Sequence, residues 1–152
     1  MIEKRIDLWQ AAHGAEAVCI TTNGTVTGRG LGVMGRGCAL EAAERYNPGK
    51  KRYQTLQRRL GDHLRMHGNH VGILVPPPPW TLVAFPVKHE WQEMADFELI
   101  YRSCKELIAL ADRHGWTQVV LPRPGCGNGG LSWVVVQPIG LILDDRFIVV
   151  TK

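Results

Sequence analysis

The sequence predicts an α/β sandwich built around a mostly buried sheet. Short runs of β-branched and other apolar residues alternate with stretches in which apolar residues recur every three or four positions. The first pattern is typical of buried strands and the second of amphipathic helices. The 152 residues show no repeat, composition shift or low-complexity linker. We therefore expect a single domain over residues 1–152, long enough to bury a sizeable core.

Strands are expected where short apolar runs end at turn residues. The first run stops at Asn23-Gly24, a turn dipeptide, and a loop with six glycines follows it to Gly37. Four prolines at 76–79 make a turn that cannot join a central ladder, so the runs on either side should pair antiparallel. Strands are predicted at 17–22, 71–75, 80–85, 118–121 and 147–150.

Helices are expected where apolar residues share one face. Tyr53, Leu56, Leu60 and Leu64 lie at helical spacing. The last helix carries three valines and Pro138, which disfavour helical structure. Helices are predicted at 39–45, 50–66, 96–114 and 133–143.

Composition limits the classes of function. Part of the net charge of +4 comes from the basic residues at 50–52 and 58–59. Such a cluster indicates either a solvated helix face or a surface that attracts a nucleotide or DNA. No apolar run approaches the roughly 20 residues of a membrane span, and no secretory signal is visible, so we expect a cytoplasmic protein without membrane contact. The four cysteines form no C-x-x-C pair and no zinc pattern. We therefore expect no disulfide framework, no metal and no cofactor.

Two glycine-rich loops carry the chemistry. The pattern G-x-G-x-x-G occurs at 30–35 and again at 125–130, each time between a predicted strand and a predicted helix. Glycine permits positive φ and lets backbone N–H groups approach a ligand with no Cβ in the way. Successive N–H groups at the start of a helix attract anions. Two such loops therefore favour a ligand with two adjacent phosphates.

Three common phosphate-binding or hydrolytic sites fit less well. A P-loop needs Lys followed by Ser or Thr after the glycines, whereas Arg36-Gly37 stands here. A Rossmann site needs an acidic residue about 20 positions on, and here the region 50–59 is basic. The serine-hydrolase motif G-x-S-x-G is absent.

Four segments resemble those of macro domains, in particular the DarG-antitoxin and terminal ADP-ribose glycohydrolase type. Asn23 with 33–39 (VMGRGCA) resembles the first ADP-ribose loop, and 121–133 (LPRPGCGNGGLSW) resembles the second. Residues 85–91 (FPVKHEW) resemble an F-P-T-K-x-x-W segment, and 5–9 (RIDLW) resemble the opening strand. They occur in the family's order. The resemblance implies a three-layer α/β/α sandwich with a mixed central sheet.

The same resemblance implies an ADP-ribose site. Asp7 corresponds to the acid that accepts from the adenine amino group, although it also suits a helix cap. Asn23 corresponds to an asparagine near the distal ribose, although Asn-Gly also suits a turn. Cys126 would contribute mainly its backbone. The remaining implied contacts are Val33, Met34, Gly35, Arg36, Gly37, Gly125, Gly127, Asn128, Gly129 and Gly130.

Lys88 is the candidate catalytic residue. It corresponds to the lysine that acts on the anomeric carbon in DarG-type enzymes, and burial could bring its amine into the working range. Related enzymes place an aspartate in the second loop, where 128–130 reads Asn-Gly-Gly. The resemblance thus implies a lysine-dependent hydrolase that removes ADP-ribose from a macromolecule, with a DNA base as one acceptor. His89 and Glu90 could assist with protons. Trp91 and Trp133 are expected in the core, with the wall of the pocket as the alternative.

Two alternative functions stay open. The first is a non-catalytic ADP-ribose reader or metabolite-binding module, which the missing second-loop acid favours. The second, minor alternative is a phosphatase acting on ADP-ribose-1″-phosphate. The expected partner is ADP-ribose or an ADP-ribosylated macromolecule, nucleic acid included, and the residues identify no toxin partner. The insertion-like stretch 24–32 could reshape the distal-ribose pocket but favours none of these functions.

Overall fold

A computed structural model describes residues 1–47 and 54–152 of the protein. In this part of the chain the elements follow one another as β1 (Ile2–Arg5), α1 (Leu8–Ala11), β2 (Ala17–Asn23), α2 (Gly37–Tyr46), α3 (Thr55–His67), β3 (Gly72–Val75), β4 (Thr81–Lys88), α4 (Phe97–His114), β5 (Val119–Pro122), α5 (Trp133–Gly140) and β6 (Phe147–Thr151). All five predicted strands are confirmed, each with slightly shifted ends.

The strands form one mixed sheet in the order β1-β6-β5-β2-β4-β3. β3 and β4 pair antiparallel, as predicted, and the other neighbours pair parallel. In the sheet, β4 lies on one side of β2 and β5 on the other. The carboxyl ends of these three parallel strands meet at the same edge of the sheet. Such a switch point commonly opens a ligand crevice.

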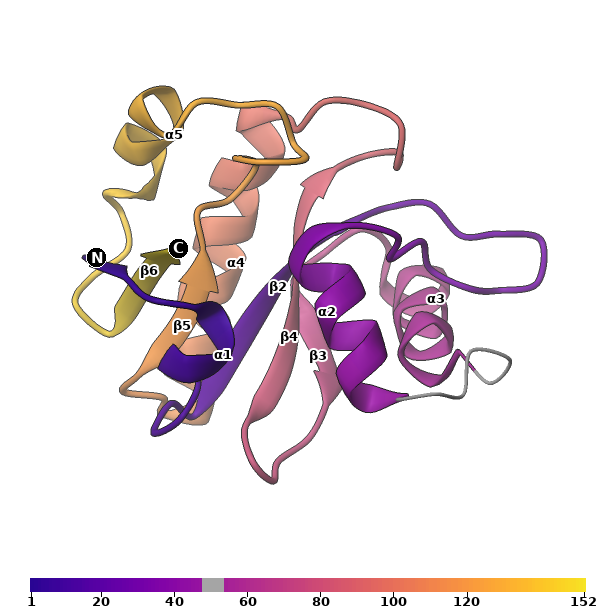
Figure 1. The fold of residues 1–152 in the computed structure, drawn as a ribbon, viewed down its shortest axis with the longest axis horizontal. Coiled ribbons are helices and arrows are strands. Elements are labelled where there is room, and N and C mark those ends of the chain that lie inside the picture. Colours follow the sequence, from indigo (N-terminus) through magenta and orange to yellow (C-terminus); the bar gives the residue numbers. More distant parts are fainter. Residues whose placement is uncertain (48–53) are drawn as a thin grey trace.

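Helices cover both faces of the sheet, which confirms the three-layer α/β/α fold (Figure 1). Along β2, Val18 and Ile20 pack with α1, α2 and α3. The intervening Ala17 and Cys19 pack with α4 and α5 on the opposite face. This alternation follows from the two-residue period of a strand whose two faces are both buried.

Cys104 of α4 is fully buried, and burial raises the pKa of its thiol to about 12.

The N-terminal segment differs from the expectation. The strand is β1, and the residues after it form the short helix α1 instead of continuing the strand. The reason is Asp7, whose carboxylate accepts hydrogen bonds from the backbone N–H groups of Trp9 (3.0 Å) and Gln10 (3.4 Å). An aspartate in this N-cap position starts a helix.

Three further boundaries were predicted wrongly. In the described residues α3 begins at Thr55, because Gln54 has a left-handed φ of 46°. The predicted helix residues 50–53, including Tyr53, lie outside the described residues, as do Pro48-Gly49 of the predicted break. α5 ends at Gly140 and not at 143. β4 continues through Pro86 to Lys88, since this stretch remains paired with β2.

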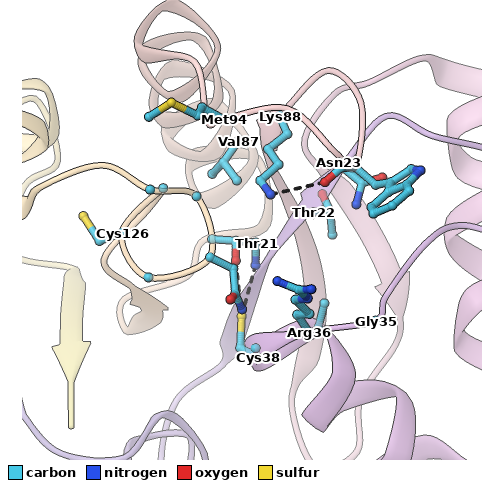
Figure 2. Close-up of a pocket in the computed structure, with 18 of the residues that line it drawn as sticks. Thr21, Thr22, Asn23, Gly35, Arg36, Cys38, Val87, Lys88, Met94 and Cys126 are labelled. Carbon is cyan, nitrogen blue, oxygen red and sulfur yellow. Dashed lines mark hydrogen bonds between the residues drawn. The ribbon is translucent and has the colours of Figure 1, made fainter.

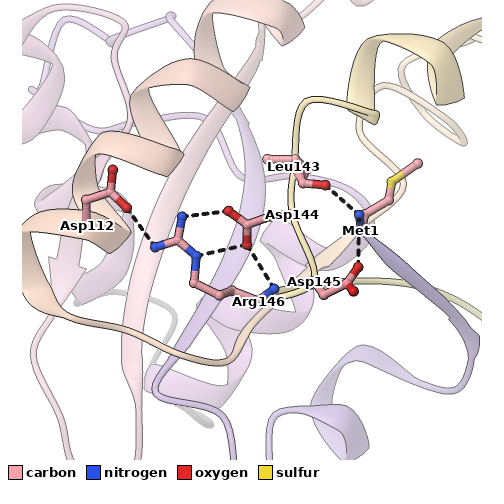
Figure 3. Close-up of polar contacts among 6 residues, drawn as sticks. All are labelled: Met1, Asp112, Leu143, Asp144, Asp145 and Arg146. Carbon is pink, nitrogen blue, oxygen red and sulfur yellow. Dashed lines mark hydrogen bonds and ion pairs between the residues drawn. The ribbon is translucent and has the colours of Figure 1, made fainter.

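Polar contacts link the turn before β6 to Met1 and to α4 (Figure 3). The Met1 amino group donates to the carbonyl of Leu143 and lies 3.9 Å from a carboxylate oxygen of Asp145. The Arg146 guanidinium donates to Asp144 (2.7 and 2.9 Å) and to Asp112 of α4 (2.7 Å).

Among the described residues, no helix combines the length and apolarity needed to cross a membrane.

Candidate functional site

A cavity of about 770 Å³ lies at the switch point, above the carboxyl ends of β2, β4 and β5 (Figure 2). Its walls are the two glycine-rich loops, together with the end of β4 and the segment that follows it. The lining residues are 21–23, 33–39, 87–88, 91–94, 122–123 and 125–130. Every predicted site residue except Asp7 is among them. The fold thus brings together segments that are about 100 positions apart in the sequence.

The first loop is held in place by Asn23. Its side-chain amide donates to the carbonyl of Val33 (3.0 Å), and its side-chain oxygen accepts from the N–H of Thr25 (3.1 Å). Met34 buries its side chain in the core, so it offers the cavity mainly backbone. α2 then begins at Gly37 without a side-chain cap from Arg36. Its first N–H groups are therefore available to an anion at the positive end of the helix.

The second loop needs glycine for two separate reasons. Gly125, Gly127 and Gly130 have φ values of 75°, 91° and 79°, in the region that favours glycine. A Cβ on Gly129 would lie 2.3 Å from the carbonyl oxygen of Gly125, so the loop is also too tight for a side chain. The Gly129 carbonyl accepts from the N–H of Ala95 (3.0 Å), which anchors the loop beside the start of α4.

The two loops face each other across the cleft. A Cβ placed on Gly37 would lie 3.0 Å from the side-chain nitrogen of Asn128. Arg36, Lys88 and Arg123 line the cavity, and among the described lining residues Glu93 is the single carboxylate. Both the backbone N–H groups and the side-chain charges therefore favour an anionic ligand.

Lys88 lies at the end of β4, opposite Asn23 in the register of β2 and β4. It is half-buried, and its amine points into the cavity and donates to the carbonyl of Trp91 (3.3 Å) (Figure 2). The side chain of Asn69 donates to the Lys88 carbonyl (2.9 Å) and fixes its backbone. The amine thus lies next to the first loop.

The side chains of His89 and Glu90 are engaged outside the cavity. His89 pairs with Asp96, the N-cap of α4 (2.8 Å), and this hydrogen bond lowers the pKa of the Asp96 carboxyl. Glu90 accepts from the hydroxyl of Thr25 (2.7 Å). Neither residue lines the cavity. Their contacts support positioning of the segment after Lys88 more than proton transfer.

Asp7 and the stretch 24–32 lie outside the cavity lining. Asp7 caps α1 and pairs with Lys152 (3.5 Å), so the structure shows the capping role, and the adenine contact stays a prediction. The stretch 24–32 forms a hairpin with a bridge between Val26 and Gly32. It packs against α3 instead of entering the pocket, and Gly32 donates to the carbonyl of Gln57 (2.8 Å).

Several lining residues were not predicted. Trp91 was expected in the core, with the pocket wall as the alternative; the structure agrees with the alternative, because Trp91 lines the cavity and is 54% exposed. Trp133, by contrast, does not line the cavity. Its half-buried ring donates to Glu3 (2.7 Å) and lies under the guanidinium of Arg123. The only sequence signal for Trp91 was its place in the segment 85–91. The other unpredicted lining residues are Thr21, Thr22, Cys38, Ala39, Val87, Gln92, Glu93, Met94, Pro122 and Arg123.

The cavity contains two thiols, Cys38 and Cys126. Cys38 contacts the Thr21 hydroxyl (3.3 Å), and burial raises the pKa of its thiol. Burial also raises the pKa of Cys126. A raised pKa keeps a thiol protonated and poorly nucleophilic, so neither cysteine has the character of a nucleophile. Within residues 1–47 and 54–152 no three His, Cys, Asp or Glu side chains are grouped as metal ligands.

The chain has a macrodomain fold. The macrodomain of Mycobacterium tuberculosis DarG superposes with a TM-score of 0.75 at 22% identity, over 99% of this chain and 97% of that chain. The macrodomain of Thermus aquaticus DarG gives 0.74 at 23% identity, over 99% and 97%. Thermosipho africanus DarTG in complex with ADP-ribose gives 0.70 at 17% identity, over 96% of this chain and 40% of that one. The fold is that of a DarG-type macrodomain.

Sequence comparison points to the same group. Two proteins named DNA ADP-ribosyl glycohydrolase, from Thermus aquaticus and Mycobacterium tuberculosis, are 28% and 30% identical over 108 and 111 residues. These alignments cover 70% of this chain but only 29% and 30% of the relatives, so the chain matches less than a third of their length. No protein-family model matches the sequence.

Proposed function

We propose that this chain binds ADP-ribose and removes it from a modified macromolecule, with a DNA base as the first acceptor to test. One observation carries the proposal. Two glycine-rich loops, one after β2 and one after β5, face each other across a single cleft, and the amine of Lys88 lies beside the first of them. The DNA acceptor is suggested by the names of the sequence relatives.

The diphosphate would lie between the loops. The uncapped start of α2 offers N–H groups from one side, and the glycine turn at 125–130 offers backbone from the other. The cationic side chains of Arg36 and Arg123 also line the cleft and add to the attraction. We expect free ADP-ribose to bind in the micromolar range, at roughly −8 kcal/mol. NAD⁺ should bind less well, and the reverse order measured by calorimetry would indicate a dinucleotide enzyme instead.

Lys88 would act on the distal ribose, because β4 ends next to Asn23 of the first loop. Its neutral amine would attack the anomeric carbon. The bond to the acceptor breaks, and the acceptor leaves with the electron pair and takes up a proton. Water then releases ADP-ribose and restores the amine. This route needs no carboxylate from the second loop, where 128–130 has none.

The test follows release of ADP-ribose from an oligonucleotide with one ADP-ribosylated base and from an ADP-ribosylated peptide. Lys88→Ala should bind ADP-ribose within a few-fold of wild type but lose turnover by at least about 100-fold, since most of the affinity comes from the diphosphate and adenine. Lys105→Ala is the matched control, because Lys105 is exposed on α4 and contacts Tyr101. Full activity in Lys88→Ala would eliminate the lysine mechanism.

The reader function is the second candidate, and the missing carboxylate in the second loop favours it. A wild-type protein that binds ADP-ribose but releases none from any modified substrate would establish the reader. Phosphate release from ADP-ribose-1″-phosphate, without release of ADP-ribose from macromolecules, would instead establish the minor phosphatase alternative.

A further inference from the structure

Trp91 is a large aromatic side chain left half in solvent at the cavity. It is 54% exposed and also lines the pocket. Its backbone is held on both sides: the N–H donates to the hydroxyl of Thr25 (2.9 Å), and the carbonyl accepts from the amine of Lys88 (3.3 Å). An exposed tryptophan on a fixed backbone beside a candidate catalytic group is typical of a recognition surface.

The segment that carries Trp91 is braced by residues distant in sequence. Gly24 donates to the carbonyl of His89 (3.1 Å), and Asn69 donates to the carbonyl of Lys88 (2.9 Å). A Cβ on Gly24 would lie 2.6 Å from the His89 carbonyl oxygen, so only glycine allows this approach. These contacts hold the segment before any ligand arrives. A segment with a preorganised backbone loses less freedom on binding than a mobile one.

Trp91 is tied to the first-loop side of the cleft. Its N–H bonds Thr25, and Thr25 in turn donates to Asn23. Met94, on the same segment, leans over the second loop, where its Cε lies 3.3 Å from the position of a Cβ on Gly130. Figure 2 places Met94 and Asn23 on opposite sides of Lys88. In the proposed mechanism the Lys88 amine acts where the acceptor joins the distal ribose, and this amine donates to the carbonyl of Trp91, so Trp91 borders the place of the acceptor.

We propose that Trp91 is a specificity-determining residue that stacks on a planar acceptor, a nucleobase, and holds it beside Lys88. The inference rests on the proposed function, since it requires that ADP-ribose occupies the cleft. Every nucleobase has a π-face, so stacking recognises bases without reading their sequence. The aliphatic serine or glutamate acceptors of proteins have no such face and gain little from the ring. Loss of one stacking contact corresponds to a change in affinity of about 5- to 150-fold.

The experiment compares two dissociation constants for each variant, in the Lys88→Ala background so that the ligand is not consumed. One is for free ADP-ribose, and the other is for a short single-stranded oligonucleotide with one ADP-ribosylated base. In Trp91→Ala, the advantage of the oligonucleotide over free ADP-ribose should shrink by about 5- to 150-fold. Trp91→Phe should restore most of it. Tyr101→Ala, which removes an exposed aromatic of α4 outside the cavity, should leave it unchanged.

Three results would overturn the proposal. Unchanged dissociation constants for both ligands in Trp91→Ala would show that the ring does not contact the acceptor. Equal weakening of both ligands would place the ring in the ADP-ribose subsite. Equal weakening of an ADP-ribosylated peptide and the oligonucleotide would remove the preference for a base. Failure of free ADP-ribose to bind any variant or the wild type would instead reject the proposed function, and the Trp91 proposal with it.

Discussion

The loop glycines differ in what an added side chain would meet, and this difference separates ligand contact from folding. A Cβ on Gly129 would strike the Gly125 carbonyl at 2.3 Å, so substitution there would disrupt the loop itself. Gly127 faces open space, but its φ of 91° would strain any other residue. Gly35 lines the cavity and has no positive φ, and no described atom lies within 4 Å of the point where its Cβ would stand. It therefore gives the cleanest test.

Gly35→Val should lower the affinity for ADP-ribose by at least about 10-fold, because two methyl groups would occupy space that a phosphate needs; a loss of this size is about 1.4 kcal/mol. The melting temperature should stay within about 2 °C of wild type, as for a surface substitution. Gly28→Val is the matched control, since Gly28 has the same open surroundings but lies outside the cavity. Calorimetry and thermal melting measure the two effects. Normal binding by Gly35→Val would show that the ligand does not pass this residue.

The site residues that the sequence predicts are those whose chemistry is local. The glycines and Lys88 lie in short motifs, and the structure brings them to one cleft. The sequence left Trp91 between core and pocket wall, because its backbone is held by Thr25, and that of Lys88 by Asn69, and both partners are far away in the sequence. Local sequence alone predicts that an apolar residue after a strand is buried, because it does not show the long-range contacts of that residue's backbone.

At the scale of elements, length decides what the sequence could predict. α4 has several helical turns and an Asp96 cap, and its predicted start and end agree with the structure. α1 has only four residues, too few for a periodic pattern, and a strand was expected there. β4 was expected to stop before Pro86, yet the strand continues because its partner β2 extends alongside it. Pairing between distant segments thus overrides the local signal.

The hairpin 24–32 is attached to α3 by two close approaches of glycine. A Cβ on Gly61 of α3 would lie 1.9 Å from the carbonyl oxygen of Gly30, and one on Gly32 would lie 2.6 Å from Leu60. Gly32 also donates to the carbonyl of Gln57 (2.8 Å). These contacts explain why a glycine stands inside a helix, where it costs about 1 kcal/mol relative to alanine.

Gly61→Ala should therefore destabilise the protein even though helix propensity alone predicts stabilisation. Displacing the backbone of the hairpin should cost about 1–3 kcal/mol, as overpacking does, and this exceeds the gain of about 1 kcal/mol in propensity. Urea denaturation measures the free energy of unfolding. Asp62→Ala, at the exposed neighbouring position of α3, is the control and should change it by less than about 0.5 kcal/mol. Stabilisation by Gly61→Ala would mean that the hairpin does not dock on α3.

For the whole molecule, the sequence predicted the layers but not the order of the strands. Alternating strands and helices require a sheet covered on both faces. The place of β1 beside β6 cannot be inferred in the same way, because its four residues are all exposed and carry no buried pattern. The chain ends meet there, and Arg146 fastens the turn before β6 to α4 through Asp144 and Asp112 (Figure 3).

The ion pair between Arg146 and Asp144 should make the free energy of unfolding depend on pH. The Arg146 guanidinium, which donates to both oxygens of Asp144, holds the pKa of that carboxyl at about 2, below its ordinary 3.8. A carboxyl with a depressed pKa in the folded protein stabilises it above its ordinary pKa, and this contribution disappears as the pH falls through the folded value. The stabilisation should therefore be complete above about pH 4 and be lost between about pH 4 and pH 2. Because the Asp144 side chain is 51% exposed, solvent screening limits the effect to about 1 kcal/mol.

Arg146→Met should lower the free energy of unfolding at pH 7. The difference in this free energy between wild type and variant should become smaller as the pH falls toward 2. Urea denaturation at pH 7, 5, 4 and 3 follows the change, and added salt should reduce the difference at pH 7 because the carboxylate is partly exposed. Arg113→Met, in the exposed last turn of α4, is the matched control and should leave the pH profile unchanged. The Arg146 guanidinium also lies 5.3 Å from the centre of the Phe147 ring. If the free energy of unfolding differs between variant and wild type by the same amount at pH 7 and pH 3, Arg146 acts only through this packing.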